Sequence, residues 1–597
     1  MASPVLFALI ISLVHISLGS IFTAPEQVST SKKYDFIIVG AGTAGSVIAA
    51  RVSEDPSVNV LVIEAGVADN GADSELIYIP LLAGEGVGTI FDWNYTTTAQ
   101  SGFNGRALDF PRGFVMGGSS AINGMIYSRG SSDEYDRLAK MSGDSGWSWD
   151  SLEEYRLMNE KHSPPWNNRS NVGEYDPRVH GYGPLLTGLT PTVFETDKRV
   201  IANTAAYPEQ YPFTLDLNSG NGLGFGWLET SVGNGSRSTS ASTYLHPALN
   251  SRSNLDILLH TQATRLVSTS GKATFRKVQV AQSATTTEYS FTATKEVILC
   301  AGSVGTPQLL MLSGIGPTAQ LKNVGITPVL NLPDVGNNLQ DQSILALQWE
   351  VNGTTLSSLL RNATAVDASL EQWSINKTGP AAGNMIVNTI GFLRLPSNST
   401  LLAAGDPAAG PNSAHIQLSF LETFYPNPGQ VSPSTGSWMS ATVVVQSPTS
   451  RGFLNLTSSS AFVHPTINPA YYTTAFDIGA AIEGVKMLRD FLATPVWDGY
   501  IIAPYSAVAV LETDAEIETY IRSFANTLDH PTSTAKISKT TDNFGVVGPE
   551  LLVKGATGLR IVDASILPAA VAGFPQAEVY IIAERAAGLI KSAWSLS

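Results

Sequence analysis

The chain has 597 residues, of which 43% are hydrophobic and 14% charged, and its formal net charge is −15. A chain of this length and apolar content can bury more than one core, which excludes a disordered protein. Lysine and arginine form no basic run that could bind a phosphate backbone, so we expect no nucleic-acid partner.

The first 19 residues predict a secretory signal peptide. Residues 4–18 are apolar and uncharged, and the expected cleavage site follows Gly19. The run is shorter than the ~20 residues that cross a bilayer, so we expect an extracellular protein without a membrane span. Cys300 is the only cysteine, which excludes an intramolecular disulfide. Asn-X-Ser/Thr triplets, which fit a glycosylated protein, begin at Asn94, Asn168, Asn234, Asn352, Asn362, Asn376, Asn398 and Asn455.

Residues 34–64 have the pattern of a dinucleotide-binding unit. A buried apolar strand runs into Gly40, Gly42 and Gly45, and an Ala-rich helix follows. In such a unit the glycines allow a tight turn and close approach of the backbone to a pyrophosphate, and the helix N-terminus offers free N–H groups to the phosphates. A second strand ends at Glu64, where an acid can bind a ribose hydroxyl. The sequence therefore predicts an adenine dinucleotide cofactor.

The rest of the chain continues the alternation of strands, glycine turns and helices. The segments singled out are a glycine-rich stretch at 111–130, strands over 254–267 and 285–299, a glycine turn and apolar helix at 302–317, a strand at 558–565 and a helix over 576–591. Residues 346–447 are rich in Ser, Thr, Asn and Pro, which indicates a separate, more variable region.

Together these segments resemble the glucose-methanol-choline (GMC) oxidoreductases, flavoproteins that include fungal aryl-alcohol oxidases. Residues 111–130 and 302–317 are similar to the two family signatures, and residues 559–568 to the C-terminal flavin strand. The resemblance implies a mixed α/β fold, in which a discontinuous Rossmann-like FAD-binding domain joins an antiparallel-sheet substrate domain. The expected divisions are a signal peptide (1–19), an N-terminal FAD-binding core (34–345), a variable substrate-side cap (346–447) and a C-terminal region completing both sites (448–591).

The resemblance also implies which residues bind FAD. Carried over by position, the ADP half would be held by Gly40, Gly42, Gly45 and Glu64, with Ala263 on the adenine side. The isoalloxazine would be lined by Arg112, Gly117, Gly118, Ser120 and Asn123, and Asp563 would lie near the pyrophosphate and ribityl chain. Phe114 stands where some relatives carry a flavin-attaching histidine, so we expect non-covalent FAD.

At the chemical centre the chain both matches and departs from the family. His530 matches the family base, which takes the hydroxyl proton while hydride leaves carbon for flavin N5. Phe574 stands where the family has a second His or Asn, and it can neither accept a proton nor hydrogen-bond an oxygen. Gln342 replaces a His that usually follows the Asp matched by Asp341. Phe574 is therefore expected to shape an apolar or aromatic substrate pocket.

Three functions stay open at this point. The first is an alcohol oxidase or dehydrogenase that uses His530 and is reoxidised by O₂ or a quinone-like acceptor, acting on an apolar, aromatic or secondary-metabolite alcohol. The second keeps FAD structurally and catalyses a non-redox lyase or cyclase step, as hydroxynitrile lyases and versicolorin B synthase do. The third is a non-enzymatic flavoprotein. The flavin-facing residues favour the first, and Phe574 favours the second.

No metal is expected, because the sequence has neither HExxH nor CxxC spacing. His246, His260 and His464 are expected to be structural. The sequence predicts neither the oligomeric state nor the particular substrate.

Overall fold

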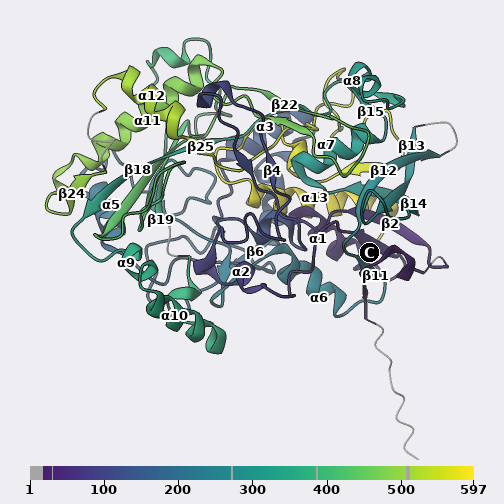
Figure 1. Ribbon diagram of the computed structural model, residues 1–597, viewed down its shortest axis with the longest axis horizontal. Coiled ribbons are helices and arrows are strands. Elements are labelled where there is room, and N and C mark those ends of the chain that lie inside the picture. The colour runs from purple at the N-terminus through teal and green to yellow at the C-terminus, as the bar shows by residue number, and fades with distance from the viewer. Residues whose placement is uncertain (1–17, 30, 270–272, 385–386, 506–510) are drawn as a thin grey trace, which may run out of the picture.

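The computed structural model describes residues 18–29, 31–269, 273–384, 387–505 and 511–597, so residues 1–17 of the expected signal peptide lie outside the described residues. Two large sheets lie on opposite sides of the molecule. In Figure 1 the strands β2 and β14 lie on the right, and β18 and β19 on the left.

The first sheet has eight strands and is mostly parallel. Its order is β1 (Ser20–Phe22), β11 (Leu255–Leu258), β3 (Val60–Ile63), β2 (Tyr34–Val39), β14 (Tyr289–Leu299), β13 (Thr274–Ala281) and β12 (Gln262–Thr269), with β26 (Leu559–Ile561) also paired to β14. All pairs are parallel except β14–β13 and β13–β12. β3 and the C-terminal halves of β2 and β14 are apolar and buried, because helices such as α1 (Thr43–Val52) and α13 (Gln576–Trp594), which pack on each other, cover the sheet.

The single strand expected over 254–267 is wrong, because this stretch forms two strands. β11 lies beside β3 in the parallel part of the sheet, whereas β12 pairs antiparallel with β13. Between them His260 has a φ of 53°, in the left-handed region. No glycine or proline marks this turn, so the sequence gives no strong signal that separates the two strands.

The second sheet has seven strands and is wholly antiparallel. Its order is β24 (Ile501–Pro504), β18 (Ser343–Val351), β21 (Trp438–Val445), β20 (Ile416–Leu421), β19 (Val387–Leu393) and β8 (Gly224–Trp227), with β25 (Asn526–Thr527) also paired to β18. Residues 346–447 thus contribute central strands of this sheet, bonded to strands from both flanking regions. They do not form a separate spatial unit, and their variability among relatives stays a prediction.

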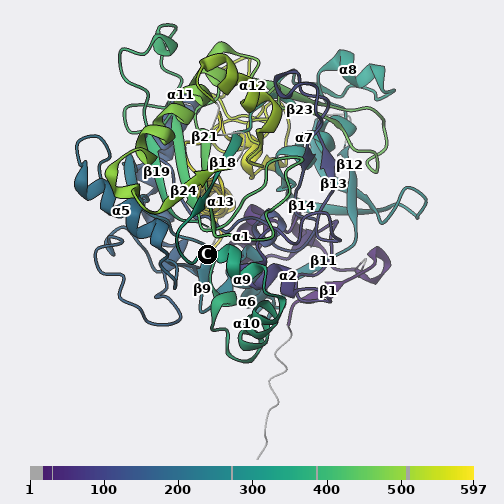
Figure 2. The same cartoon turned by 60° about the vertical axis from the view of Figure 1, so that its left-hand side comes forward.

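The two faces of this sheet differ in their surroundings. Ile416, Leu418 and Phe420 of β20 belong to an apolar cluster with α11 (Ala475–Leu492), which lies over the strands in Figure 2. Because side chains alternate along a strand, Gln417 and Ser419 point to the opposite face. That face looks toward the first sheet.

The remaining elements connect and cover these two sheets. The other helices are α2 (Glu75–Tyr78), α3 (Ser132–Ser142), α4 (Glu153–Leu157), α5 (Glu195–Ala206), α6 (His246–Leu249), α7 (Gly302–Leu312), α8 (Thr318–Asn323), α9 (Leu356–Leu360), α10 (Ala363–Asn376) and α12 (Asp514–Phe524). The short strands are β4 (Tyr95–Thr96), β5 (Asp109–Phe110), β6 (Glu160–His162), β7 (Leu185–Thr187), β9 (Val232–Gly233), β10 (Ser236–Arg237), β15 (Ile315–Gly316), β16 (Leu330–Asn331), β17 (Asn337–Leu339), β22 (Gly452–Asn455) and β23 (Thr466–Asn468). None of the described helices is long and apolar enough to cross a membrane.

Candidate active site

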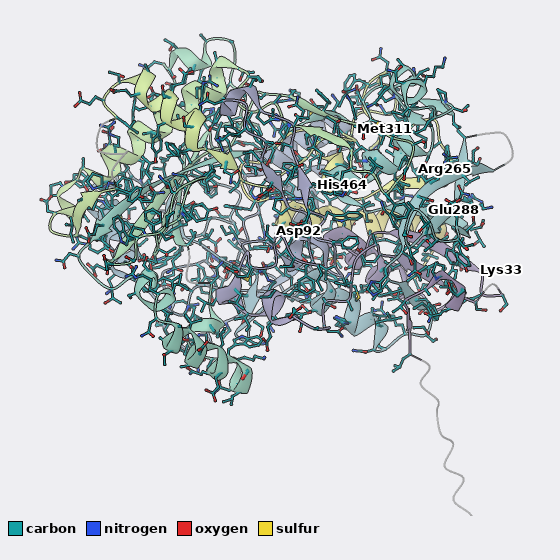
Figure 3. All side chains as sticks on the ribbon, viewed as in Figure 1. Lys33, Asp92, Arg265, Glu288, Met311 and His464 are labelled. Atoms are coloured by element: carbon teal, nitrogen blue, oxygen red, sulfur yellow. The ribbon has the colours of Figure 1, made fainter. Side chains whose placement is uncertain are left out.

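A cavity of about 730 Å³ lies between the two sheets. The loop that carries Asp92, labelled near the middle of the view in Figure 3, helps to build it: the Asp92 Oδ1 atom accepts the backbone N–H of Arg112 at 3.0 Å. The expected cofactor and catalytic residues that line the cavity are Gly40, Gly42, Glu64, Arg112, Gly118, Ser120, Asn123, Ala263, His530, Asp563 and Phe574. Gly45 and Gly117 lie behind its wall, and His246, His260 and His464 do not line it.

The glycines at the start of α1 leave bare backbone beside the cavity. Gly40 has a φ of 103°, which other residues rarely adopt, and a Cβ there would lie 2.5 Å from the Cys300 carbonyl oxygen. A Cβ on Gly118 would lie 2.6 Å from the Gly42 Cα. The two glycine segments therefore meet backbone to backbone at the N-terminus of α1, where free N–H groups favour a phosphate.

Glu64 is fixed at the end of β3 by backbone donors. Its Oε2 accepts from Ala41 N at 2.7 Å and its Oε1 from Gly66 N at 2.8 Å. Burial raises the pKa of Glu64 to about 7, against the opposing effect of these N–H groups. The carboxyl group borders the cavity at the position expected of a ribose-binding acid.

Asp563 joins the C-terminal strand β26 to the start of α7. Its Oδ2 accepts from Gly302 N at 3.0 Å and Thr306 Oγ1 at 2.6 Å, and its Oδ1 accepts from Ser565 N at 2.9 Å. Burial raises the pKa of this carboxyl group. Asp563 therefore holds the cavity wall together, and its contact with a pyrophosphate or ribityl chain stays a prediction.

The residues expected at the isoalloxazine are already bonded to protein. Ser120 Oγ donates to Gly117 O at 2.7 Å. Asn123 Oδ1 accepts from Arg237 Nη1 at 2.7 Å, and its Nδ2 donates to Gln576 Oε1. This part of the wall is pre-formed, because its polar side chains are held by neighbours rather than waiting for a ligand.

His530 lies on the cavity wall, three residues after the end of β25. Its backbone N–H donates to Asp341 Oδ1 at 2.7 Å, and its ring Nδ1 lies 2.7 Å from Gln342 Oε1. Withdrawal from water, with the nearby charge of Arg112, lowers the pKa of His530 to about 3. The imidazole is therefore neutral at neutral pH and can accept a proton.

Phe574 lies beside this histidine. The centroids of its ring and the His530 ring are 5.2 Å apart, at an interplanar angle of 78°. Phe574 is 6% exposed and packs in an apolar cluster with Val387, Ile390 and Leu421. The structure thus places His530, the expected base, beside Phe574, which stands where the family has a polar residue.

Several polar groups of this site were missed by the sequence interpretation. Gln417, Ser419 and Thr442 line the cavity from the second sheet, and the buried Oγ1 of Thr442 has no partner among the described residues. Asp529 also lines the cavity, and burial raises its pKa to about 8. Single polar residues in apolar strands carry no sequence signal of a shared site.

The expected glycosylation sites lie at the surface. Seven of these asparagines are exposed, and Asn455 is partly exposed. Their attachment to glycans stays a prediction.

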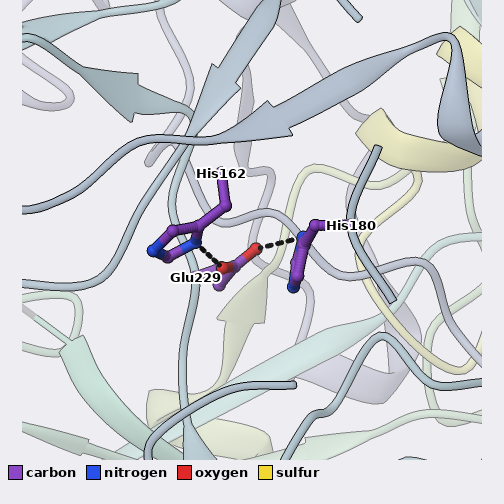
Figure 4. A group of neighbouring side chains, drawn as sticks. All are labelled: His162, His180 and Glu229. Atoms are coloured by element: carbon purple, nitrogen blue, oxygen red, sulfur yellow. Dashed lines mark hydrogen bonds and ion pairs between the residues drawn. The ribbon is translucent and has the colours of Figure 1, made fainter. Parts of the chain in front are cut away.

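A second cluster of side chains, brought together from separate parts of the sequence, is a candidate metal site. His162, His180 and Glu229 place ligand atoms within 4.8 Å of one another (Figure 4). However, His180 Nδ1 lies 3.1 Å from Glu160 Oε1, and its Nε2 lies 3.0 Å from Asp216 Oδ2. Burial alone lowers the pKa of His180, but the carboxylates of Glu229, Asp216 and Glu160 raise it to about 10. A protonated imidazole has no lone pair for a metal, so we interpret the cluster as a buried ion network.

Comparison with known proteins shows which family the chain resembles. Family models described as GMC oxidoreductase match residues 34–344 and 448–583. The chain is 36% identical to "Dehydrogenase eriK" of Hericium erinaceus and 34% identical to "Pyranose dehydrogenase 3" of Leucoagaricus meleagris, with 97% of each chain covered in both cases. A solved formate oxidase variant from Aspergillus oryzae, studied for FAD modification, superposes with a TM-score of 0.86 at 28% identity, covering 97% of this chain and 99% of that one.

The fold and the matched relatives define an FAD-dependent oxidoreductase. The chain belongs to the GMC oxidoreductase family.

Proposed function

We propose that this chain is a secreted, glycosylated FAD-dependent oxidoreductase that oxidises the CH–OH group of an alcohol, with His530 as the base. One observation carries the proposal. The neutral imidazole of His530 lines the dinucleotide cavity, and no described residue bonds its Nε2. That nitrogen is available to a substrate hydroxyl.

FAD is the cofactor that this cavity fits. The bare glycine backbone at α1 suits the pyrophosphate, Glu64 the ribose, and Arg112, Ser120 and Asn123 the isoalloxazine edge. When bound there, FAD supplies the acceptor for a hydride from the alcohol carbon. The protein residues hold and orient the substrate and remove its hydroxyl proton at His530 Nε2. O₂ or a quinone-like compound is the proposed final acceptor.

The cavity supports an alcohol with an apolar or aromatic body. Phe574, Ile344 and Leu421 offer apolar surface beside the base. The unpartnered hydroxyl of Thr442, next to Ser419 across β20 and β21, suits a further substrate oxygen. The pyranose dehydrogenase relative is named for such an oxygen-rich substrate.

A second candidate is a non-redox lyase or cyclase that keeps FAD structurally. The observation that favours it is the Phe574 ring, which packs at 78° to the His530 ring where the family has a hydrogen-bonding group. In that case His530 would still move a proton, but the flavin would stay oxidised during turnover.

Anaerobic flavin absorbance separates the two candidates. The purified protein is mixed with a panel of aryl, aliphatic and sugar alcohols, and His530→Gln is the control. For the oxidoreductase we expect bleaching of the visible flavin band by some alcohols, slowed about 10²–10⁴-fold in the variant. Product formation with an oxidised flavin would instead support the non-redox function. N-terminal sequencing of secreted protein should find Ser20 first, and deglycosylation should lower its mass.

A further inference from the structure

Behind His530, three glutamine side chains form a continuous line of hydrogen bonds. Gln342 lies immediately before β18, Gln446 immediately after β21, and Gln417 within β20. All three are at most 2% exposed. The line joins His530 at one end to the Oγ atom of Ser419, in the cavity wall, at the other. It therefore connects the proposed base with the substrate side of the cavity.

The Gln342 amide can take only one orientation. Its Nε2, which has two hydrogens to donate, lies 2.7 Å from Val571 O, 2.9 Å from Gln446 O and 3.0 Å from Gln446 Oε1, all of them acceptors. A flipped amide would set its own oxygen against these acceptors and lose every hydrogen bond to them, which is unfavourable. The Oε1 atom of Gln342 therefore faces His530 Nδ1 at 2.7 Å. Since an amide oxygen only accepts, Nδ1 carries the ring proton.

The same polarity continues along the line. Gln446 Nε2 donates to Gln417 Oε1 at 2.6 Å, and Gln417 Nε2 donates to Ser419 Oγ at 2.9 Å. Each amide thus fixes the orientation of the next one. The oxygen of an amide accepts from the preceding side chain, so its Nε2 must donate to the following one. Ser419 accepts at the end, so its own O–H remains available as a donor.

We propose that Gln342 is a positioning residue that keeps the proton of His530 on Nδ1 and so leaves Nε2 as a lone pair facing the cavity. This inference rests on the proposed role of His530 as the base. On proton transfer the alcohol O–H bond breaks and a new N–H bond forms at Nε2, while Nδ1 retains its proton toward Gln342. The opposite tautomer would present an N–H to the substrate and could accept nothing there.

Gln342 is the one described residue that bonds a ring nitrogen of His530. The charged or titratable groups around the ring act otherwise. Asp341 accepts the backbone N–H of His530, and Arg112 Nη2 donates to the backbone oxygen of Asp529 at 2.5 Å. None of these groups is placed to choose the tautomer through a direct bond.

Two variants and one control test the inference on the FAD-containing protein. Gln342→Leu removes the acceptor, and Gln342→Glu keeps it but adds a charge. Gln340→Leu is the control, because Gln340 is an equally buried amide of the same loop that bonds Pro448 O at 2.8 Å and Ala570 N at 2.9 Å, not His530.

The first measurement is steady-state kinetics with an alcohol that reduces the flavin. We expect Gln342→Leu to lower kcat about 10–100-fold, as removal of a partner that orients a functional imidazole does, with KM within about twofold. Gln340→Leu should lower kcat no more than about threefold. Wild-type kcat in Gln342→Leu at full FAD content would overturn the inference.

The second measurement needs no turnover. Diethylpyrocarbonate acylates only an unprotonated imidazole nitrogen, and peptide mass spectrometry reports its rate at His530. In the wild type the acylation rate of His530, unlike that of free histidine, should not change between about pH 5.5 and 7.5, because the ring is neutral throughout. In Gln342→Glu the carboxylate should stabilise the imidazolium, so the rate should fall as the pH is lowered through about 6–7.

A flat profile in Gln342→Glu would overturn the inference. This isosteric variant also carries the test if Gln342→Leu does not fold. If no alcohol reduces the wild-type flavin, the proposed function fails, and the acylation profiles still test whether the group at position 342 controls the protonation of His530.

Discussion

Replacing Phe574 by histidine should restore a hydrogen-bonding partner beside His530 and accelerate alcohol oxidation. The two rings already lie 5.2 Å apart, so an imidazole at position 574 can reach an oxygen held by His530 Nε2. A donor to a developing oxyanion is worth about 2.7–4 kcal/mol, or 10²–10³ in rate. We therefore expect the rate of flavin reduction in Phe574→His to rise by about 10²-fold.

The same substitution should lower stability. Phe574 is 6% exposed, and full burial of such a ring contributes about 1.5–3 kcal/mol. A buried, unpartnered ring nitrogen costs about 1–3 kcal/mol more when no substrate is bound. The two costs together amount to about 2.5–6 kcal/mol, and an ordinary stability margin of about 5–15 kcal/mol tolerates all but the upper end of this range.

The assay is anaerobic stopped-flow reduction of the flavin at saturating alcohol, with thermal unfolding followed by flavin fluorescence. Phe574→Leu is the matched control, since it also removes the ring but offers no donor. The reasoning is refuted if Phe574→His, with full FAD content, is reduced no faster than Phe574→Leu. Phe574 would then act only by shaping the pocket.

Two further predictions concern pH and cofactor affinity. The pKa of His530 in the folded protein is about 3, below its ordinary value of 6.5. The contribution of the neutral ring to stability is therefore present above pH 6.5 and is lost as the pH falls toward about 3. Flavin reduction should accordingly show no step near pH 6.5, and a step there would contradict the lowered pKa. Glu64→Leu should weaken FAD binding about 10–100-fold, as loss of a charged hydrogen bond does. FAD titration of the deflavinated protein measures this, with the exposed Glu54→Leu as control, and equal affinities would exclude the ribose role.

Much of the cofactor side could be predicted from the sequence. The glycines at 40, 42 and 45 and the acid at 64 lie within one strand–helix–strand unit, and the helix and second strand appear where the pattern places them. Such units can be recognised in a sequence because all their residues fall within one strand–helix–strand unit of ~30 residues. The resemblance to a family supplied His530 and Phe574, which the cavity then brings side by side.

The tertiary structure alone decided which distant side chains meet. The hydrogen bond between Gln342 and His530 spans 188 positions, and that between Gln342 and Gln446 spans 104. Strand register and the alternation of side chains across a sheet select such partners, and neither can be seen from single polar residues in apolar runs. The turn at His260, which splits one apolar run into two strands, is a further example, because it uses no turn-forming residue.

The sequence by itself therefore determined the cofactor unit and the family, and it supplied His530 as the proposed base. Only the packing of the two sheets decided the setting of that base, including which ring nitrogen carries the proton. The physical reason is that a dinucleotide motif is encoded by residues close in the chain, whereas the protonation state of a buried imidazole depends on every group that folding places around it.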